Sequence, residues 1–141
     1  MATQLQRQDE ARADAAILSL ALVRIARFWQ LSNAELGRIL GLSPASVSRL
    51  KGGNYQVEPG TKPFELGQLL VRLFRGLDAL VGSDDRAAAY WLRGDNDDLG
   101  ARPLDLIGSV RGAATATVKA LCSIVVRGST MRAAAKKRSR Q

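Results

Sequence analysis

The clearest structural signal in the chain is the stretch LSNAELGRILGLSPASVSRLK, residues 31–51. Ser32 followed by Glu35 fits a capping box, in which each side chain satisfies a backbone N–H at the beginning of a helix. A second helix start follows closely, because Ser43 can cap a helix and Pro44 suits its first position. The stretch therefore predicts two short helices joined by a tight turn, which is the helix-turn-helix arrangement.

Two such helices can pack together only if certain positions are glycine or apolar, and residues 31–51 have these residue types at those positions. Gly41 suits the left-handed position that ends the first helix. Gly37 lies inside that helix, where glycine costs about 1 kcal/mol relative to alanine and therefore needs a packing reason. A close approach of the second helix supplies this reason. We expect the inner faces to be formed by five apolar residues, namely Leu36, Leu40, Leu42, Val47 and Leu50.

The outer side of the second helix is polar and basic, and its N-terminus is expected to enter a major groove of DNA. Arg49 is a candidate to contact the edge of a guanine base or a phosphate. The expected DNA contacts come from Ser43, Ser46, Ser48, Arg49, Lys51 and Asn54. The alternative is a pair of purely structural helices with a small polar outer face. Because one copy is only weakly basic, the sequence also predicts a homodimer, which would double the contacts with DNA.

The composition of the 141 residues excludes several classes of protein. A hydrophobic content of 46% and a charged content of 24% are typical of one domain or two small ones. The absence of histidine excludes catalysis by a histidine base and His-ligated metals, and the single cysteine, Cys122, excludes an internal disulfide. We expect no enzymatic activity, no cofactor and no metal. The lack of a disulfide framework favours a cytoplasmic location. No apolar run approaches the roughly 20 residues that cross a bilayer, so we expect no membrane association.

The charges are unevenly distributed along the chain. Residues 1–82 contain 10 basic and 7 acidic residues, residues 83–128 contain 6 of each, and residues 129–141 contain 5 basic and no acidic residues. The net charge is +8. A basic front, a neutral middle and a strongly basic tail suggest different partners for the three segments.

The three- and four-residue spacing of apolar residues predicts helices elsewhere as well, so we expect an all-α protein. The expected domains are a DNA-binding and dimerisation domain at 1–82, a second helical domain at 83–128 and a basic tail at 129–141. Outside the helix-turn-helix, the predicted helices are 14–29, 64–81, 84–92, 103–110 and an apolar stripe at 114–125, where β-branched residues also allow a strand.

The second domain carries a series of short motifs in a fixed order. They are the pair Trp91-Leu92, a loop with Asn96, the step Leu99-Gly100, the helix start Pro103-Leu104, then Gly112 and an apolar segment that ends at Gly128. This order resembles the toxin-binding domain of the Xre/MbcA/ParS antitoxin family, the partners of RES-domain toxins. With the helix-turn-helix, the resemblance covers roughly residues 15–128. The chain departs from the family pattern at Asp95, where a proline is common, and in having one glycine at Gly100.

The resemblance implies an antitoxin of a type II toxin–antitoxin system. Such a protein binds a RES-domain toxin, an NAD-consuming or ADP-ribosylating enzyme, occludes its active site and represses its own operon by binding operator DNA. The resemblance places toxin contacts at Asn96, Leu99, Gly100, Pro103, Arg132, Lys136 and Lys137. The alternative is a stand-alone helix-turn-helix regulator without a toxin partner.

The acidic loop of the second domain and the basic tail each allow more than one interpretation. Asp95, Asp97 and Asp98 imitate the beginning of a calcium loop, but Leu99 occupies a ligand position, so we expect them to form a plain loop. In that loop Asn96 is expected to adopt unusual backbone angles. The basic tail is either a solvated end, a segment that attracts phosphates, or an insertion toward the NAD pocket of the toxin.

Overall fold

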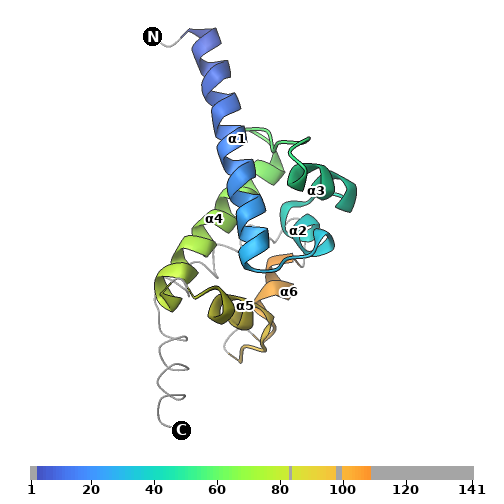
Figure 1. Cartoon of the computed structure of the whole chain (residues 1–141), viewed down its shortest axis with the longest axis vertical. Coiled ribbons are helices and arrows are strands. Elements are labelled where there is room, and N and C mark those ends of the chain that lie inside the picture. The colour runs from blue at the N-terminus through green and yellow to red at the C-terminus, as the bar shows by residue number, and fades with distance from the viewer. Residues whose placement is uncertain (1–2, 83, 98–99, 109–141) are drawn as a thin grey trace. The chain divides into compact units, whose positions relative to one another are not determined.

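The computed structural model describes residues 3–82, 84–97 and 100–108, and all regular elements in this part of the chain are α-helices (Figure 1). The all-α prediction is therefore confirmed. The predicted stripe at 114–125 and the basic tail lie outside the described residues. The helices are α1 (Gln4–Phe28), α2 (Asn33–Leu40), α3 (Pro44–Lys51), α4 (Lys62–Val81), α5 (Asp85–Arg93) and α6 (Pro103–Gly108).

The chain forms two compact units, Met1–Val71 and Arg72–Gln141, so that α4 contributes its first half to one and its second half to the other. Gly82 follows the end of α4 and has a φ of +62°, in the left-handed region that glycine tolerates best. The domain boundary expected near this glycine stays a prediction.

Helix α1 begins ten residues earlier than the sequence predicts. Its start is fixed by a capping box in which the Thr3 N–H donates to Oε1 of Gln6 (2.8 Å) and the Gln6 N–H donates to Oγ1 of Thr3 (3.3 Å). The first residues of the helix carry no apolar periodicity, which is why their helical state was not predicted. The later part of α1 has the predicted inner face, with Leu22 and Ile25 buried.

Both predicted starts of the helix-turn-helix are confirmed. The Ser32 N–H donates to Oε1 of Glu35 (2.9 Å), and the Glu35 N–H donates to Oγ of Ser32 (3.1 Å). Gly41 ends α2 with a φ of +72°, and Pro44 is the first residue of α3. Local side chains therefore determine where both helices begin and where the first one ends.

The predicted contact between α2 and α3 is also present. Val47 and Leu50 of α3 are buried, at 0% and 2% exposure, as are Leu36 and Leu40 of α2. Leu42 in the turn is only half-buried, and its backbone carbonyl faces Gly37.

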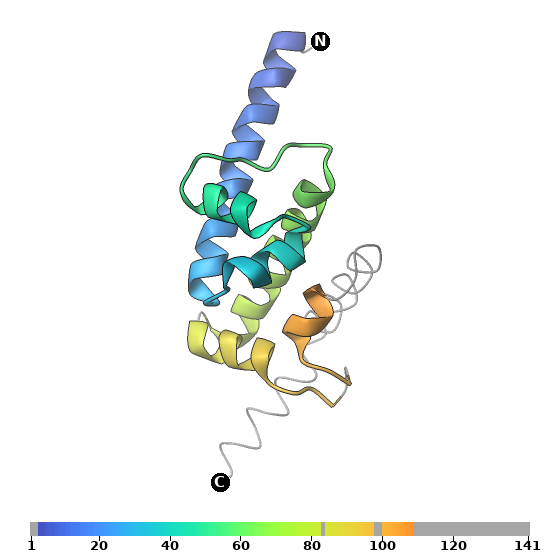
Figure 2. The same ribbon diagram turned by 90° about the vertical axis from the view of Figure 1, so that its right-hand side faces the viewer.

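Two further contacts complete the first unit. A Cβ on Gly67 of α4 would lie 3.0 Å from Cδ1 of Leu22, so glycine allows α4 to approach α1 closely. The loop that leads into α4 passes across α1 (Figure 2). It is fastened there by the buried Val57 N–H, which donates to Oγ of Ser19 (3.0 Å). The loop after α3 is therefore a packed part of this unit.

The second unit is built on α5 and α6, which contact each other, and on the second half of α4. Asp84 caps α5 by accepting hydrogen bonds from the N–H groups of Arg86 and Ala87. The core of this second unit consists of buried aliphatic side chains, namely Leu73, Leu77, Ala88, Leu92, Leu104 and Ile107.

Candidate DNA interface and toxin-binding region

The first turn of α3 is organised around Ser43. Its Oγ accepts a hydrogen bond from the Ser46 N–H (3.1 Å) and donates one to the Ser46 Oγ (3.0 Å). The hydroxyl of Ser43 is therefore engaged in capping. Pro44 has no N–H, and the N–H groups of Ser46 and Val47 donate to Ser43, so Ala45 has the backbone N–H of this turn that a ligand could meet. Backbone N–H groups at a helix N-terminus favour a phosphate.

Arg49 lies one turn further along the outer side of α3 and is exposed. Its Nη2 donates to Oγ of Ser46 at 3.3 Å. One of the five N–H donors of the guanidinium thus holds the side chain along the helix, while the group keeps the donors that a bidentate contact with guanine or phosphate needs. Ser48 is exposed on the same helix.

Lys51 and Asn54 follow at the end of α3. The Nζ of Lys51 donates to the backbone carbonyl of Leu31 (3.3 Å), which ties the end of α3 to the turn before α2. The backbone N–H of Asn54 donates to the carbonyl of Arg49 (2.8 Å), and its side chain is exposed. Lys51 therefore has a structural contact that the sequence did not predict, in addition to its expected role at DNA.

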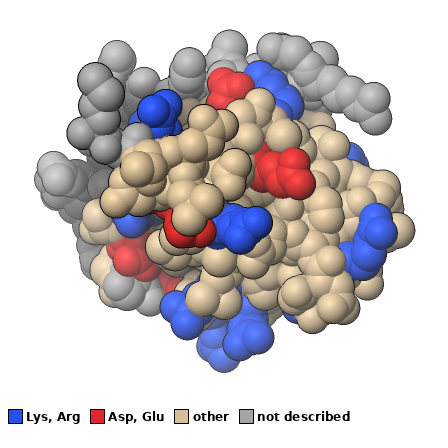
Figure 3. Space-filling view, turned by 90° about the horizontal axis from the view of Figure 1, so that it is seen from above, with Lys and Arg blue, Asp and Glu red and all other residues tan. Residues whose placement is uncertain are grey.

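The charge around the helix-turn-helix is positive but modest. Residues 31–55 contain three basic residues, Arg38, Arg49 and Lys51, and one acidic residue, Glu35. Glu35 accepts the capping hydrogen bond of α2. On the face of the molecule that is seen from above, basic and acidic side chains are interspersed (Figure 3). The small excess of positive charge on residues 31–55 agrees with an interface that needs more than one copy to bind DNA tightly.

The loop between α5 and α6 has a different geometry from the one expected. Gly100, with a φ of +72°, donates its N–H to the carbonyl of Asn96 (2.9 Å). Asn96 is half-buried and does not have a positive φ, so the expectation of unusual angles at Asn96 is wrong. The glycine adopts the left-handed conformation instead, because it has no Cβ to strain there.

The remaining residues predicted to contact the toxin are only partly described. Pro103 is buried where it begins α6. Just before it, Arg102 makes a two-pronged ion pair with Asp105, with Nε and Nη2 at 2.8 and 2.9 Å from the carboxylate oxygens. Leu99, Arg132, Lys136 and Lys137 lie outside the described residues, and their roles stay predictions.

Helix α5 carries two aromatic residues with different surroundings. Tyr90 is 65% exposed, and no local sequence pattern indicates this exposure. Trp91 is half-buried, and its Nε1 is buried with no hydrogen-bond partner in the part of the chain that the structure describes. An exposed tyrosine is the kind of side chain that anchors protein–protein interfaces.

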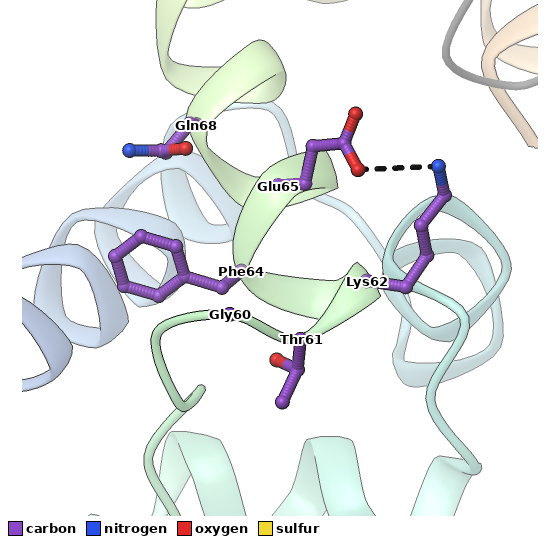
Figure 4. Close-up of a pocket in the computed structure, with 6 residues that line it drawn as sticks. All are labelled: Gly60, Thr61, Lys62, Phe64, Glu65 and Gln68. Atoms are coloured by element: carbon purple, nitrogen blue, oxygen red, sulfur yellow. Dashed lines mark hydrogen bonds and ion pairs between the residues drawn. The ribbon is translucent and has the colours of Figure 1, made fainter.

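A surface depression of about 470 Å³ lies at the start of α4 (Figure 4). It is lined by Gly60, Thr61, Lys62, Phe64, Glu65 and Gln68. Lys62 and Glu65 form an ion pair across 3.2 Å at one side of it. The side chains that line it do not pair a nucleophile with a base, so the depression offers no recognisable catalytic chemistry.

Residues 3–82, 84–97 and 100–108 contain no group of three or more His, Cys, Asp or Glu side chains placed to hold a metal ion. Within the same ranges, none of the helices combines the length and the apolar content needed to span a bilayer.

Two family models match consecutive parts of the chain. A family model for the antitoxin Xre-like helix-turn-helix domain matches residues 5–75, which is half of the chain. A second model, for the antitoxin Xre/MbcA/ParS C-terminal toxin-binding domain, matches residues 76–115. A search of curated proteins found no match.

Proposed function

This chain belongs to the Xre/MbcA/ParS family of antitoxins, and we propose that it neutralises a RES-domain toxin by binding to it directly and occluding its active site. The observation that carries the proposal is the presence, in one chain, of a helix-turn-helix domain and a toxin-binding domain. The RES identity of the toxin rests on the resemblance of the motifs between Trp91 and Gly128 to the family pattern.

The proposed toxin contacts are Asn96, Leu99, Gly100 and Pro103 in the loop before α6, together with Arg132, Lys136 and Lys137 of the tail. A near-neutral second domain favours a protein partner over nucleic acid, because it lacks the excess of positive charge that phosphates require. The tail has that excess of positive charge, and we propose that it extends toward the NAD site of the toxin without entering it deeply, because a pocket that binds pyrophosphate is itself electropositive. The antitoxin itself contributes no catalytic group.

We further propose that the first domain represses the operon by binding operator DNA in the cytoplasm. The proposed contacts are Ser43, Ser46, Ser48, Arg49, Lys51 and Asn54. The burial of Val47 and Leu50 supports this, because it directs the polar side of α3 outward. A homodimer is part of the proposal, since two copies of a modestly charged helix-turn-helix bind two half-sites about one helical turn apart.

The decisive experiment is co-expression of the full chain with the product of the neighbouring reading frame, scoring growth, cellular NAD and co-purification. We expect the neighbouring product alone to stop growth and deplete NAD, and the antitoxin to restore both while co-purifying with it. A stand-alone regulator would restore neither and would leave the neighbouring protein unbound. Growth arrest without NAD loss, relieved by the antitoxin, would retain the antitoxin function but contradict the RES chemistry.

The contribution of the tail is tested separately by replacing Arg132, Lys136 and Lys137 with alanine in the full chain. The proposal predicts weaker binding of the toxin and residual NAD consumption in the complex. Unchanged neutralisation would remove the tail from the mechanism and leave the loop before α6 as the proposed contact.

A further inference from the structure

Helix α1 exposes an unusual amount of apolar surface. The large hydrophobic side chains that are exposed in the described part of the chain are Leu5 (71%), Ile17 (68%), Leu20 (54%), Phe28 (42%) and Tyr90 (65%). Four of these five belong to α1. Single exposed hydrophobic residues are ordinary, but a cluster of them on one helix marks an interaction site.

These side chains share one face of the helix. With about 100° per residue, the buried residues Leu18, Leu22 and Ile25 define the inner face, which packs within the first unit. Leu5, Ile17, Leu20 and Phe28 all fall on the opposite half of the helix, together with the small residues Ala13 and Ala16. We call this half the outer face of α1. A helix that is apolar on two faces is usually covered on both.

Charged residues flank the centre of the outer face in a mirrored pattern. Asp9 and Glu10 lie on the N-terminal side of Ile17, and Arg24 and Arg27 lie on its C-terminal side. All four side chains are exposed. Among the residues that the structure describes, none of these four has an ion-pair partner. The outer face is therefore acidic at one end, apolar in the middle and basic at the other end.

The first part of α1 also lacks support from its own domain. Residues 4–14 are exposed except for the half-buried Ala11, and both views show this arm extending past the other elements of its unit (Figures 1 and 2). A helix of this length is marginal on its own in water. Its stability would increase if a partner surface covered it.

We propose that the outer face of α1 binds the same face of a second copy in antiparallel orientation, with Ile17 near the two-fold axis. This arrangement places Glu10 against Arg24 of the second copy and Asp9 against its Arg27. It also brings Ile17, Leu20 and Phe28 into the interface, which covers three of the four exposed large hydrophobic residues of α1. The arm of each copy then lies against the folded body of the other.

The charge pattern is the reason for choosing a second copy as the partner. In a parallel pair, the two acidic ends would meet each other and the two basic ends would meet each other, which is unfavourable. In an antiparallel pair, the acidic end of each copy meets the basic end of the other, so the two-fold symmetry produces the favourable contact twice. A different protein would not require the charges to be balanced about one residue. The inference rests on the proposed homodimer and specifies which surface forms it.

The first test measures the mass of the full chain by light scattering across a concentration series. Ile17→Lys is expected to raise the dimer dissociation constant at least about tenfold, because it places two like charges at the centre of the interface. The side chain is 68% exposed, so the variant should remain folded. The matched control is Gln56→Lys, which adds the same charge at an exposed loop position and is expected to leave the dimer unchanged.

A charge exchange tests the orientation of the two helices. Glu10→Arg alone and Arg24→Glu alone are each expected to weaken the dimer, because each creates two repulsive pairs. The double variant E10R/R24E restores opposite charges across the interface and is expected to return the dissociation constant to within about threefold of the wild type. A double variant that is weaker than both single variants would overturn the antiparallel register.

A cysteine at the two-fold axis gives an independent readout. In a Cys122→Ser background, Ile17→Cys is expected to form a disulfide-linked dimer under mild oxidation, since the proposed register brings the two positions within bonding distance. Gln68→Cys, exposed on α4, is the control and should remain monomeric on a non-reducing gel.

The outcomes separate this inference from the proposed function. A wild-type dimer that no α1 variant weakens would overturn the α1 surface while keeping the homodimer. A wild-type monomer at all concentrations would overturn both, and toxin capture would still report on antitoxin function. Loss of toxin capture in Ile17→Lys, with the mass unchanged, would assign the outer face to the toxin instead.

Discussion

The carbonyl oxygen of Leu42 lies 2.6 Å from the position that a Cβ atom on Gly37 would occupy. The Leu42 N–H also donates to the carbonyl of Gly37 (2.9 Å), so the turn is fastened to α2 at this point. The contact is with backbone rather than with the end of a flexible side chain. Glycine at position 37 is therefore what allows α2 and the turn to pack as a helix-turn-helix.

Gly37→Ala is expected to lower the free energy of unfolding by about 1–3 kcal/mol, the typical cost of forcing an extra methyl group into a packed contact. The measurement is urea unfolding followed by circular dichroism. Gly52→Ala is the matched control, because a Cβ there would meet its nearest neighbour at an ordinary 3.4 Å. Equal stability of the two variants would show that the turn does not need glycine.

Ser19→Ala is expected to destabilise the first unit by about 1–3 kcal/mol, because the buried N–H of Val57 would lose its acceptor. Hydrogen exchange at the Val57 amide should become faster at the same time. Ser48→Ala, at an exposed position on α3, should leave stability within about 0.5 kcal/mol of the wild type. Unchanged exchange at Val57 in the Ser19 variant would argue against this hydrogen bond.

Replacing each of the two tryptophans with phenylalanine is expected to change stability by different amounts. Trp91→Phe should change stability by less than about 1 kcal/mol, since it removes a buried donor that has no partner among the described residues. Trp29→Phe should cost more, because Trp29 is 1% exposed and lies in the core of the first unit. Thermal unfolding of both variants tests this, and a larger loss for Trp91→Phe would contradict the burial pattern.

Arg49→Ala is expected to weaken binding to the operator by about 1–3 kcal/mol, equivalent to roughly 5- to 150-fold, if Arg49 reads a base edge. Lys62→Ala removes the same charge on α4 and is expected to have a small effect. Fluorescence anisotropy at fixed salt measures both. Equal losses for the two variants would indicate general attraction of phosphates rather than a specific contact from α3.

The sequence predicts those features that depend on neighbouring residues. The capping residues Ser32 and Ser43 and the left-handed Gly41 act within one turn of the chain, so the helix boundaries that they determine could be identified directly. The apolar spacing of Val47 and Leu50 likewise predicts their burial. These local signals agree with each other, which is why the helix-turn-helix could be predicted in detail.

Features that depend on distant residues could not be predicted in this way. The bond from Val57 to Ser19 joins positions 38 residues apart, and no local pattern indicates it. The helical arm before Asp14 lacks apolar periodicity, so the spacing of apolar residues does not predict it. In the loop before α6, asparagine and glycine both tolerate left-handed angles, and the contacts of the folded chain select Gly100.

The separation of DNA binding from toxin binding is the central claim, and one experiment tests it most directly. Repression of an operator reporter and neutralisation of the co-expressed toxin are measured in the same cells for wild type, Arg49→Ala and Asn96→Ala. The account predicts that Arg49→Ala loses repression but neutralises the toxin, and that Asn96→Ala loses neutralisation. If Arg49→Ala lost both activities while remaining folded, or if neither variant affected its assigned activity, the account would be contradicted.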